Sequence, residues 1–317
     1  MLCAVLVALA LGSVAADAAT EPKFFKVGSA PEALAISPDG GRVYVVNRLG
    51  DNVWAIDSAT GRPVARAIKV GEDPRSIAIT PDGARAYVSN SDSDTVSVIN
   101  TVTNKLAAKP IEVGEGPEGI AVTPDGTRVY VANEYSDTVS VIDTATNKLA
   151  GKPIKVGSFP TAIAISPDGS RAYVANEIDS TVTVIDTTSN RRVGRDIRVG
   201  FDPVALAVTP DGNRVYVASL LDDTVSVINT ATRKPAAKPF RSEAFPCSIA
   251  ISGDGARAYV VNALADSVSV IDTRTNKRAQ PDIDVGFGPA AIAIAPDGAR
   301  AYVANGIEDT VAVLNLR

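Results

Sequence analysis

One segment of 43 residues occurs seven times in this chain of 317 residues, without insertion or deletion between copies. Its clearest marker is a tyrosine that recurs at Tyr44, Tyr87, Tyr130, Tyr173, Tyr216, Tyr259 and Tyr302. A proline recurs at the same interval from Pro31 to Pro289, and an aspartate from Asp39 to Asp297. Repeats of this length are single supersecondary units that bury their apolar faces against neighbouring copies. The sequence therefore predicts an array or ring of seven equivalent units.

Each copy contains four strand patterns separated by turn residues. In the first copy the apolar and β-branched stretches span 33–37, 42–46, 53–56 and 64–70. Pro38-Asp39-Gly40 separates the first two, because Pro presets φ, Asp bonds the nearby backbone and Gly accepts a left-handed conformation. The second stretch is apolar at adjacent positions, which is typical of a sheet buried on both faces. These features predict an all-β fold, a seven-bladed β-propeller of four-stranded antiparallel blades.

The two ends of the chain indicate how the ring closes. The seventh copy ends with its third strand pattern at 311–315, whereas residues 24–28 match the fourth pattern of the first copy. We therefore expect the N-terminal strand to complete the last blade and to cover an otherwise unpaired edge. An open solenoid is the alternative, and the missing fourth strand argues against it.

Residues 128–133 read Arg-Val-Tyr-Val-Ala-Asn, with Pro-Asp-Gly before them and Val-Ser-Val-Ile-Asp after them. In this motif, across all seven copies, the chain resembles the YVTN-repeat β-propeller family, the YncE-like secreted and surface propellers. The resemblance implies a seven-bladed ring in the envelope or on the surface of a bacterium or archaeon. It implies no shared set of catalytic residues.

The first 18 residues differ from the repeats. An apolar run at 2–11 is followed by small residues that end in Ala16-Asp17-Ala18, which predicts a secretory signal peptide, residues 1–18, cleaved after Ala18. The run is too short for a permanent membrane span. No Lys or Arg precedes it, so either the true start lies upstream or the signal is atypical, and a buried N-terminal helix is the alternative. Residues 19–317 are then one secreted, periplasmic or envelope domain.

The composition excludes several classes of function. The chain has no histidine, so it has no imidazole base and no imidazole metal ligand. Its net charge of −5 gives no reason to expect a nucleic-acid partner. Cleavage would leave Cys247 as a single thiol, which we expect to be a small buried hydrophobe. We predict a monomer without cofactor or metal, because the carboxylates at 91–94 are too few for calcium.

The candidate binding residues lie in the loops that differ between copies. These are the loops between the second and third strands, and those between the fourth strand and the next first strand. Copies 1 to 4 contribute mainly charge there, and copies 5 to 7 mainly apolar side chains. The predicted site residues are Glu32, Arg48, Arg75, Glu118, Glu134, Tyr135, Phe201, Leu220, Leu221, Phe245, Leu264 and Phe287. The alternative is that the phenylalanines fold inward as plugs between blades.

This distribution favours a non-enzymatic binding scaffold, whose partner is a protein segment or an apolar cell-envelope ligand. The charged half would select basic or hydroxylated groups. One alternative is a lactonase- or hydrolase-like enzyme with a site at the ring axis, where Glu118 and Glu134 could form an acid/base pair. Another is a surface-layer or adhesion module. The uniform Asp and Arg of the Pro-Asp-Gly turns are expected to stabilise the blades rather than to bind ligand.

Overall fold

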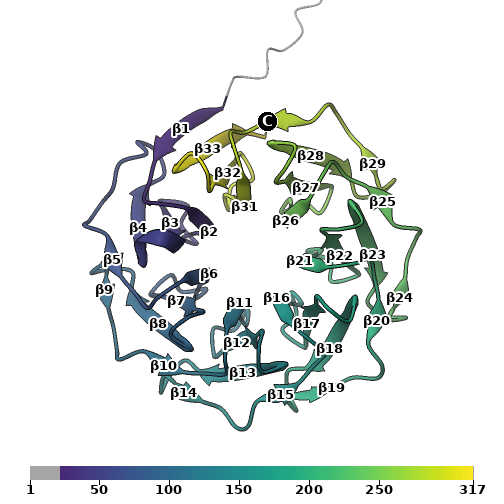
Figure 1. The fold of residues 1–317 in the computed structure, drawn as a ribbon, viewed down its shortest axis with the longest axis horizontal. Coiled ribbons are helices and arrows are strands. Elements are labelled where there is room, and N and C mark those ends of the chain that lie inside the picture. The colour runs from purple at the N-terminus through teal and green to yellow at the C-terminus, as the bar shows by residue number, and fades with distance from the viewer. Residues whose placement is uncertain (1–21, 317) are drawn as a thin grey trace, which may run out of the picture.

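The protein is a closed ring of seven antiparallel sheets around a central axis (Figure 1), seen in a computed structural model that describes residues 22–316. The all-β seven-bladed fold expected from the repeat is confirmed. Among the described residues the one helical element is the short 3-10 turn η1 (Arg48–Gly50). Within the same range no helix is long and apolar enough to cross a membrane. The predicted signal peptide lies outside the described residues.

Three strands of six residues form the body of each blade. The innermost strands are β2 (Pro31–Ile36), β6 (Pro74–Ile79), β11 (Pro117–Val122), β16 (Pro160–Ile165), β21 (Pro203–Val208), β26 (Pro246–Ile251) and β31 (Pro289–Ile294). The second strands are β3 (Arg42–Asn47), β7 (Arg85–Asn90), β12 (Arg128–Asn133), β17 (Arg171–Asn176), β22 (Arg214–Ser219), β27 (Arg257–Asn262) and β32 (Arg300–Asn305). The third strands are β4 (Asn52–Asp57), β8 (Thr95–Asn100), β13 (Thr138–Asp143), β18 (Thr181–Asp186), β23 (Thr224–Asn229), β28 (Ser267–Asp272) and β33 (Thr310–Asn315). We number the blades 1 to 7 in chain order.

The outermost strand is shorter than the sequence indicates. Instead of one strand over 64–70, blade 1 has β5 (Ile68–Lys69) and an isolated bridge between Ile56 and Pro63. Blades 2 to 6 each have two short pieces, namely β9 (Lys105–Leu106) with β10 (Ile111–Glu112), β14 (Lys148–Leu149) with β15 (Ile154–Lys155), β19 (Arg191–Arg192) with β20 (Ile197–Arg198), β24 (Lys234–Pro235) with β25 (Phe240–Arg241), and β29 (Lys277–Arg278) with β30 (Ile283–Asp284). Both pieces pair with the third strand. The segment between them is exposed and often contains a proline, which cannot donate a ladder hydrogen bond.

The ring closes as expected. Strand β1 (Lys23–Lys26) pairs antiparallel with β33, and Phe25 lies opposite Val311. Val27 continues the contact, since its N–H donates to the carbonyl of Asp309 at 2.9 Å. The first described strand and the last one therefore share blade 7 (Figure 1).

The hydrophobic core lies between blades. Tyr44, Val46 and Val53 of blade 1 pack in one cluster with Ile77 and Val88 of blade 2, and equivalent clusters follow round the ring. The second strands are buried on both faces, as their continuous apolar pattern predicts. Trp54 packs against the cluster shared by blades 7 and 1, so it fills space between blades. Each blade thus depends on its neighbours for stability.

Candidate functional site

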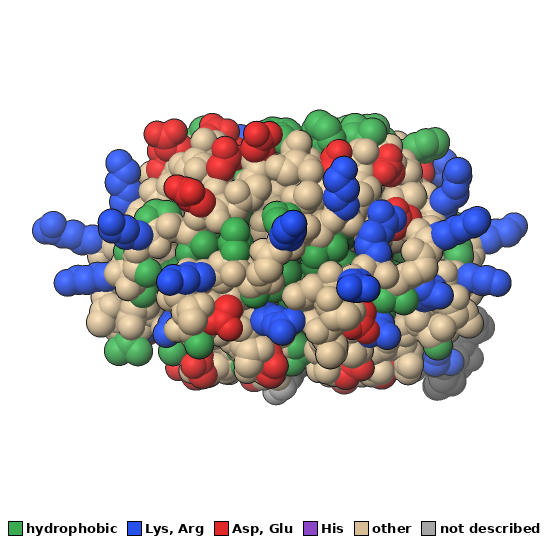
Figure 2. Space-filling model, turned by 90° about the horizontal axis from the view of Figure 1, so that it is seen from below, with side chains coloured by type: hydrophobic (Ala, Val, Ile, Leu, Met, Phe, Trp, Pro, Cys, Tyr) green, Lys and Arg blue, Asp and Glu red, His purple; other side chains and the backbone are tan. Residues whose placement is uncertain are grey.

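The two faces of the ring are built differently. On one, which we call the turn face, the Pro-Asp-Gly turns repeat with the same contacts, as in Asp39, whose carboxylate accepts hydrogen bonds from Ser37 Oγ and the N–H of Gly41. The other, the variable face, carries the loops that differ. In the edge-on view of Figure 2, acidic side chains gather on the left of the upper face and hydrophobic ones on the right, while Lys and Arg project from the waist.

A β-bulge places the residue that follows the repeated proline. In blade 1 the register between the first two strands shifts between Pro31 and Ala33, so Glu32 is the extra residue. The same shift occurs in all seven blades. Bulges re-aim a side chain at the end of a strand and are common beside functional sites. The seven bulge residues near the ring axis are Glu32, Arg75, Glu118, Thr161, Val204, Cys247 and Ala290.

The residue before each repeated proline, which we call the corner, has a left-handed backbone. In six of the seven blade junctions its backbone N–H donates a hydrogen bond to an Asp carboxylate. Asp51, for example, accepts the backbone N–H of Asp73 on its Oδ1 at 3.1 Å. Asp94, Asp137, Asp223, Asp266 and Asp309 do the same for the following corners. Asp94 is therefore already used in the fold, which argues against a separate cation loop at 91–94. Blade 4 differs, because Ser180 stands where the other six copies have Asp.

Two of these corners carry phenylalanine despite a positive φ. Phe159 has φ of 55° and Phe245 has φ of 60°, whereas Gly116 and Gly288 occupy the same position in other blades. Left-handed backbone is unfavourable for a bulky side chain, and such positions concentrate at functional sites. The Phe159 ring packs edge-on against Tyr135, with ring centroids 5.8 Å apart.

Charged side chains of blades 1 to 3 meet near the axis. Arg75 donates from Nε to Asp73 Oδ2 at 2.8 Å, and its Nη2 lies 2.7 Å from the same oxygen. Its Nε is also 3.5 Å from Glu118 Oε1. Arg48 lies 3.7 Å from Glu32 in blade 1. Four of the predicted charged residues are thus brought together in ion pairs, Glu32 with Arg48 and Glu118 with Arg75.

Burial makes Glu118 an unusual carboxyl group in this cluster. Only 18% of its side chain is exposed, and desolvation raises its pKa to about 8 although the Arg75 guanidinium opposes the shift. The charges of Glu134 and Glu32 raise the pKa further. Glu134, which is less buried, also has a raised pKa, chiefly through desolvation. Glu118 is therefore largely protonated at neutral pH.

Farther from the axis, exposed apolar side chains recur at one position of the second-to-third-strand loop. We call these residues the apolar ring, and each is between 58% and 77% exposed. Its members are Leu49, Tyr135, Ile178, Leu221, Leu264 and Ile307. Asp92 occupies the position in blade 2. The division into a charged and an apolar half thus applies to the inner residues, whereas the apolar ring extends over six blades.

The predicted apolar site residues fall into two groups. Phe201, Leu221, Leu264 and Phe287 are exposed, while Leu220 and Phe245 are partly buried. The alternative in which phenylalanines act as plugs between blades therefore does not apply to Phe201 or Phe287. Sequence reasoning missed Leu49 and Asp202 as members of this face. Comparison of equivalent repeat positions could have found them, since Leu49 aligns with Leu221 and Asp202 with Asp73.

A pocket of about 460 Å³ opens on the variable face where blades 4 and 5 meet. Its walls include Ile178, Phe201 and Leu221. The acidic lining residues are Glu177, Asp202 and Asp222, with Ser180 beside them. Glu177 and Asp202 share a side-chain hydrogen bond, and desolvation together with the Asp202 charge raises the Glu177 pKa to about 7.

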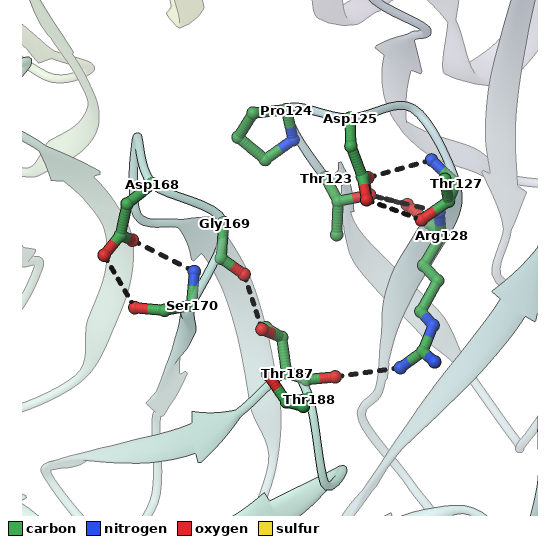
Figure 3. Close-up of a pocket in the computed structure, with 10 residues that line it drawn as sticks. All are labelled: Thr123, Pro124, Asp125, Thr127, Arg128, Asp168, Gly169, Ser170, Thr187 and Thr188. Atoms are coloured by element: carbon green, nitrogen blue, oxygen red, sulfur yellow. Dashed lines mark hydrogen bonds between the residues drawn. The ribbon is translucent and has the colours of Figure 1, made fainter.

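A larger hollow of about 590 Å³ lies on the turn face between blades 3 and 4 (Figure 3). Its polar groups bond one another: Asp125 accepts from Thr123 and Thr127, and Arg128 donates to the carbonyl of Thr187 at 2.8 Å. A similar hollow lies between blades 1 and 2. We therefore regard these hollows as a consequence of the repeated turn rather than as ligand sites.

The thiol of Cys247 is poorly suited to chemistry. Its Sγ lies 3.3 Å from the carbonyl oxygen of Pro289, and burial raises its pKa to about 12. A nucleophilic cysteine needs the opposite shift. Within residues 22–316, no three Asp, Glu or Cys side chains are grouped in a way that could hold a metal ion.

Comparisons with known proteins agree with the fold. The family model described as lactonase, 7-bladed beta-propeller, matches residues 11–109 and 203–317, which together exceed half of the chain. A second model, described as YNCE-like beta-propeller, matches residues 82–169 and 128–218, in agreement with the resemblance seen in the repeat. No curated protein matches the sequence.

Among solved structures, a chain of Kuenenia stuttgartiensis hydrazine synthase is similar, with a TM-score of 0.82 and 26% sequence identity. The match covers 92% of this chain and 97% of that chain.

Proposed function

The chain belongs to the family described as lactonase, 7-bladed beta-propeller, and from this premise and the geometry of its variable face we propose that it is a binding scaffold for a protein partner. The observation that carries this proposal is the apolar ring, six side chains at one repeat position that are each more than half exposed. Six exposed apolar side chains at one repeat position of the same face form a recurring pattern, and apolar surface concentrated on one face of a soluble protein tends to mark an interaction site.

The inner charged residues support the same function. At protein interfaces buried apolar side chains supply affinity, and charges that complement those of the partner orient it. On this face Glu32 pairs with Arg48 and Asp73 with Arg75, whereas Glu134 forms no ion pair within residues 22–316. The partner that fits is a segment with apolar side chains and a basic end.

We propose that this binding takes place outside the cytoplasm, after cleavage behind Ala18. N-terminal sequencing of the protein recovered from the periplasm or medium tests this part separately. Recovery of the uncleaved chain in the cytoplasm would contradict it.

Chemical crosslinking of residues 19–317 in an envelope extract, followed by mass spectrometry, tests the scaffold. The double variant Leu221→Asp, Leu264→Asp should capture at least tenfold less partner than the native protein does. Burying two charges at an interface without counter-ions costs several kcal/mol. Val102→Asp is the matched control, since Val102 is 77% exposed and lies on the turn face. Equal capture by all three proteins would exclude the apolar ring as the site.

The second candidate function is hydrolysis of a lactone, suggested by the description of the family. One observation favours it: Glu118, protonated at neutral pH, lies beside Arg75 and near the charge of Glu134. In such a reaction water attacks the lactone carbonyl and the ring C–O bond breaks. Glu134 would accept a proton from the water, Glu118 would donate one to the leaving alkoxide, and Arg75 would hold the oxyanion.

A lactone panel assayed by pH-stat titration tests this reaction. If it occurs, Glu118→Gln should lower kcat by about 100-fold or more, the usual contribution of a general acid. No hydrolysis above the rate in buffer would leave the scaffold as the function.

A further inference from the structure

We propose that the pocket between blades 4 and 5 binds a primary alkylammonium group, either a free amine or the end of a lysine side chain. This inference goes beyond the scaffold proposal and does not depend on it, because a small amine can be tested without any protein partner.

The first argument is the arrangement of two carboxyl groups. Glu177 and Asp202 are within hydrogen-bonding distance of each other, and within residues 22–316 neither forms an ion pair with Lys or Arg. The Oδ1 atom of Asp202 is buried and has no hydrogen-bond partner. Two carboxylates this close need a proton or a cation between them. In the empty pocket a proton on Glu177 satisfies this need, and an ammonium group can replace it.

The second argument is the shape and polarity of the pocket. Ile178, Phe201 and Leu221 form its walls and are each more than 60% exposed. Its volume of about 460 Å³ lies in the range of small-molecule sites. An alkyl chain would bury these apolar side chains while its charged end reached the carboxyl groups. The Phe201 ring could add a cation–π contact with the ammonium group.

The third argument is that this junction differs from the other six. In those, an aspartate carboxylate holds the next left-handed corner, as Asp223 does for Phe245 at 3.0 Å. Blade 4 has Ser180 instead, and Ser180 lines the pocket. The shorter side chain leaves space at this one junction, and the corner it faces carries Asp202.

The donor set selects the class of cation. A metal ion such as calcium requires six to eight oxygen ligands, and the acidic side chains here are not grouped to supply them. A primary ammonium group has three N–H donors, which match the oxygens of Glu177 and Asp202. The apolar walls favour an organic cation with at least a short alkyl chain.

The charged groups around Glu177 determine how binding depends on pH. Desolvation raises the pKa of Glu177, the carboxyl groups of Asp202 and Glu134 raise it further, and Asp222 lies in the same pocket. Below a pH of about 7 Glu177 keeps its proton, and above it the pair carries a second negative charge. Amine affinity should therefore rise with pH across this range, and binding at neutral pH should release a proton.

Isothermal titration calorimetry with n-hexylammonium tests the site, one pH unit below and one above the pKa of Glu177. We expect saturable binding that is tighter at the higher pH, and at least about tenfold weaker binding by Asp202→Asn, which loses a charge-assisted hydrogen bond. 1-Hexanol is the uncharged control ligand. Glu115→Gln is the control variant, because Glu115 is an exposed acid on the same face outside the pocket, and it should bind as the native protein does.

Ser180→Asn provides a second variant. It fills the space as an aspartate does at the other junctions, without adding charge, and asparagine tolerates the left-handed backbone at this position, where φ is 54°. It should fold like the native ring, as checked by circular dichroism, and bind no n-hexylammonium. If Asp202→Asn does not fold, Ser180→Asn and Glu177→Gln carry the test.

Titration with Nα-acetyl-lysine N-methylamide separates the two sources of the amine. Binding of both ligands indicates a site that accepts a lysine side chain, and binding of n-hexylammonium alone indicates a site for a free amine. The proposal is overturned if n-hexylammonium does not saturate the protein, if 1-hexanol binds equally well, or if folded Asp202→Asn and Ser180→Asn bind unchanged. Partner capture through the apolar ring can succeed or fail independently of these results.

Discussion

Glu118 makes the folded ring sensitive to pH through a single buried carboxyl group. Its folded-state pKa of about 8 lies above the ordinary value of 4.5, so the folded protein holds a proton that the unfolded chain releases. Between these two pH values the unfolded state binds fewer protons, and stability falls as pH rises. The stabilising contribution of the protonated group is complete below a pH of about 4.5 and is lost as pH rises to about 8.

Glu118→Gln should remove this dependence. The variant keeps the size of the side chain but cannot ionise. Its free energy of unfolding, relative to that of the native protein, should therefore increase by more than about 1.4 kcal/mol between pH 5 and pH 9. Urea unfolding at the two pH values measures it. Glu115→Gln is the exposed control and should show no such change. A difference that is independent of pH would mean that Glu118 is charged throughout.

In five of the seven repeats the tyrosine hydroxyl links its blade to the next one on the turn face. The Tyr130 hydroxyl donates to Asn190 Oδ1 at 2.6 Å, and Tyr87 and Tyr216 contact Asn147 and Asn276 in the same way. At the junction of blades 4 and 5 the equivalent residue is Arg233, and among the described residues the Tyr173 hydroxyl makes no such bond. Arg233 has a φ of 54°, which suits asparagine better.

Arg233→Asn should therefore stabilise the protein. It restores the interblade hydrogen bond and relieves the left-handed backbone, while it loses the bond from Arg233 to the Val193 carbonyl. We expect a net gain of about 1 kcal/mol, seen as a rise in Tm of about 2 °C in differential scanning calorimetry. In the double variant with Tyr173→Phe the part of the gain that comes from the hydrogen bond should disappear. A gain that survives undiminished in the double variant would assign it to the backbone alone.

At the scale of the element, strand β1 has a role that no other outer strand has, because it joins the two ends of the ring. The other outer strands consist of two-residue pieces, whereas β1 is paired with β33 over four residues. Phe25 packs against the cluster shared by blades 7 and 1, and Val27 belongs to that cluster. Their burial depends on closure.

A chain that starts at residue 28 should be much less stable than one that starts at residue 22. It loses the full burial of Val27 and the partial burial of Phe25, worth about 2 to 4 kcal/mol together, and exposes the edge of β33. Thermal unfolding should show a lower Tm, and size-exclusion chromatography should show association through the open edge. The chain from residue 22 is the control, since it keeps β1. Similar Tm values for both would show that closure contributes little.

At the scale of the whole molecule, the seven-fold scaffold separates stability from recognition. The core clusters and the turn face repeat almost without change, so loop residues on the variable face can differ without loss of the ring. On the side of the ring seen in Figure 2, Lys and Arg project from the waist, where charge at a sheet edge opposes pairing between molecules. The apolar ring and the amine pocket both lie on the variable face, where the loop sequences differ between blades.

Much of the fold could be predicted because the repeat is local and is copied seven times. The Pro-Asp-Gly turn, the buried second strand and the unmatched strands at the two ends each follow from residue types within one 43-residue window. The outer strand was predicted too long, since its pairing depends on the edge position and on prolines rather than on apolar residues. Periodicity alone thus established the ring and its closure.

The composition of the site was also predictable in part. Glu118, Glu134, Leu221 and Leu264 stand out because they vary where the repeat is otherwise regular. Their environments were not predictable. The burial of Glu118, the contact of its carboxylate with Arg75 and the partial burial of Phe245 arise from side chains of neighbouring blades.

The sequence by itself therefore determined the number of blades, the four-stranded blade and the face on which variation is concentrated. Only the tertiary structure decided which variable side chains meet, because residues 25 or more positions apart, such as Glu177 and Asp202, converge across a blade junction. Desolvation and charge at such a junction depend on all the groups packed round it. They set the raised pKa of Glu177, while the short side chain of Ser180 leaves space for the pocket, and no single repeat encodes either feature.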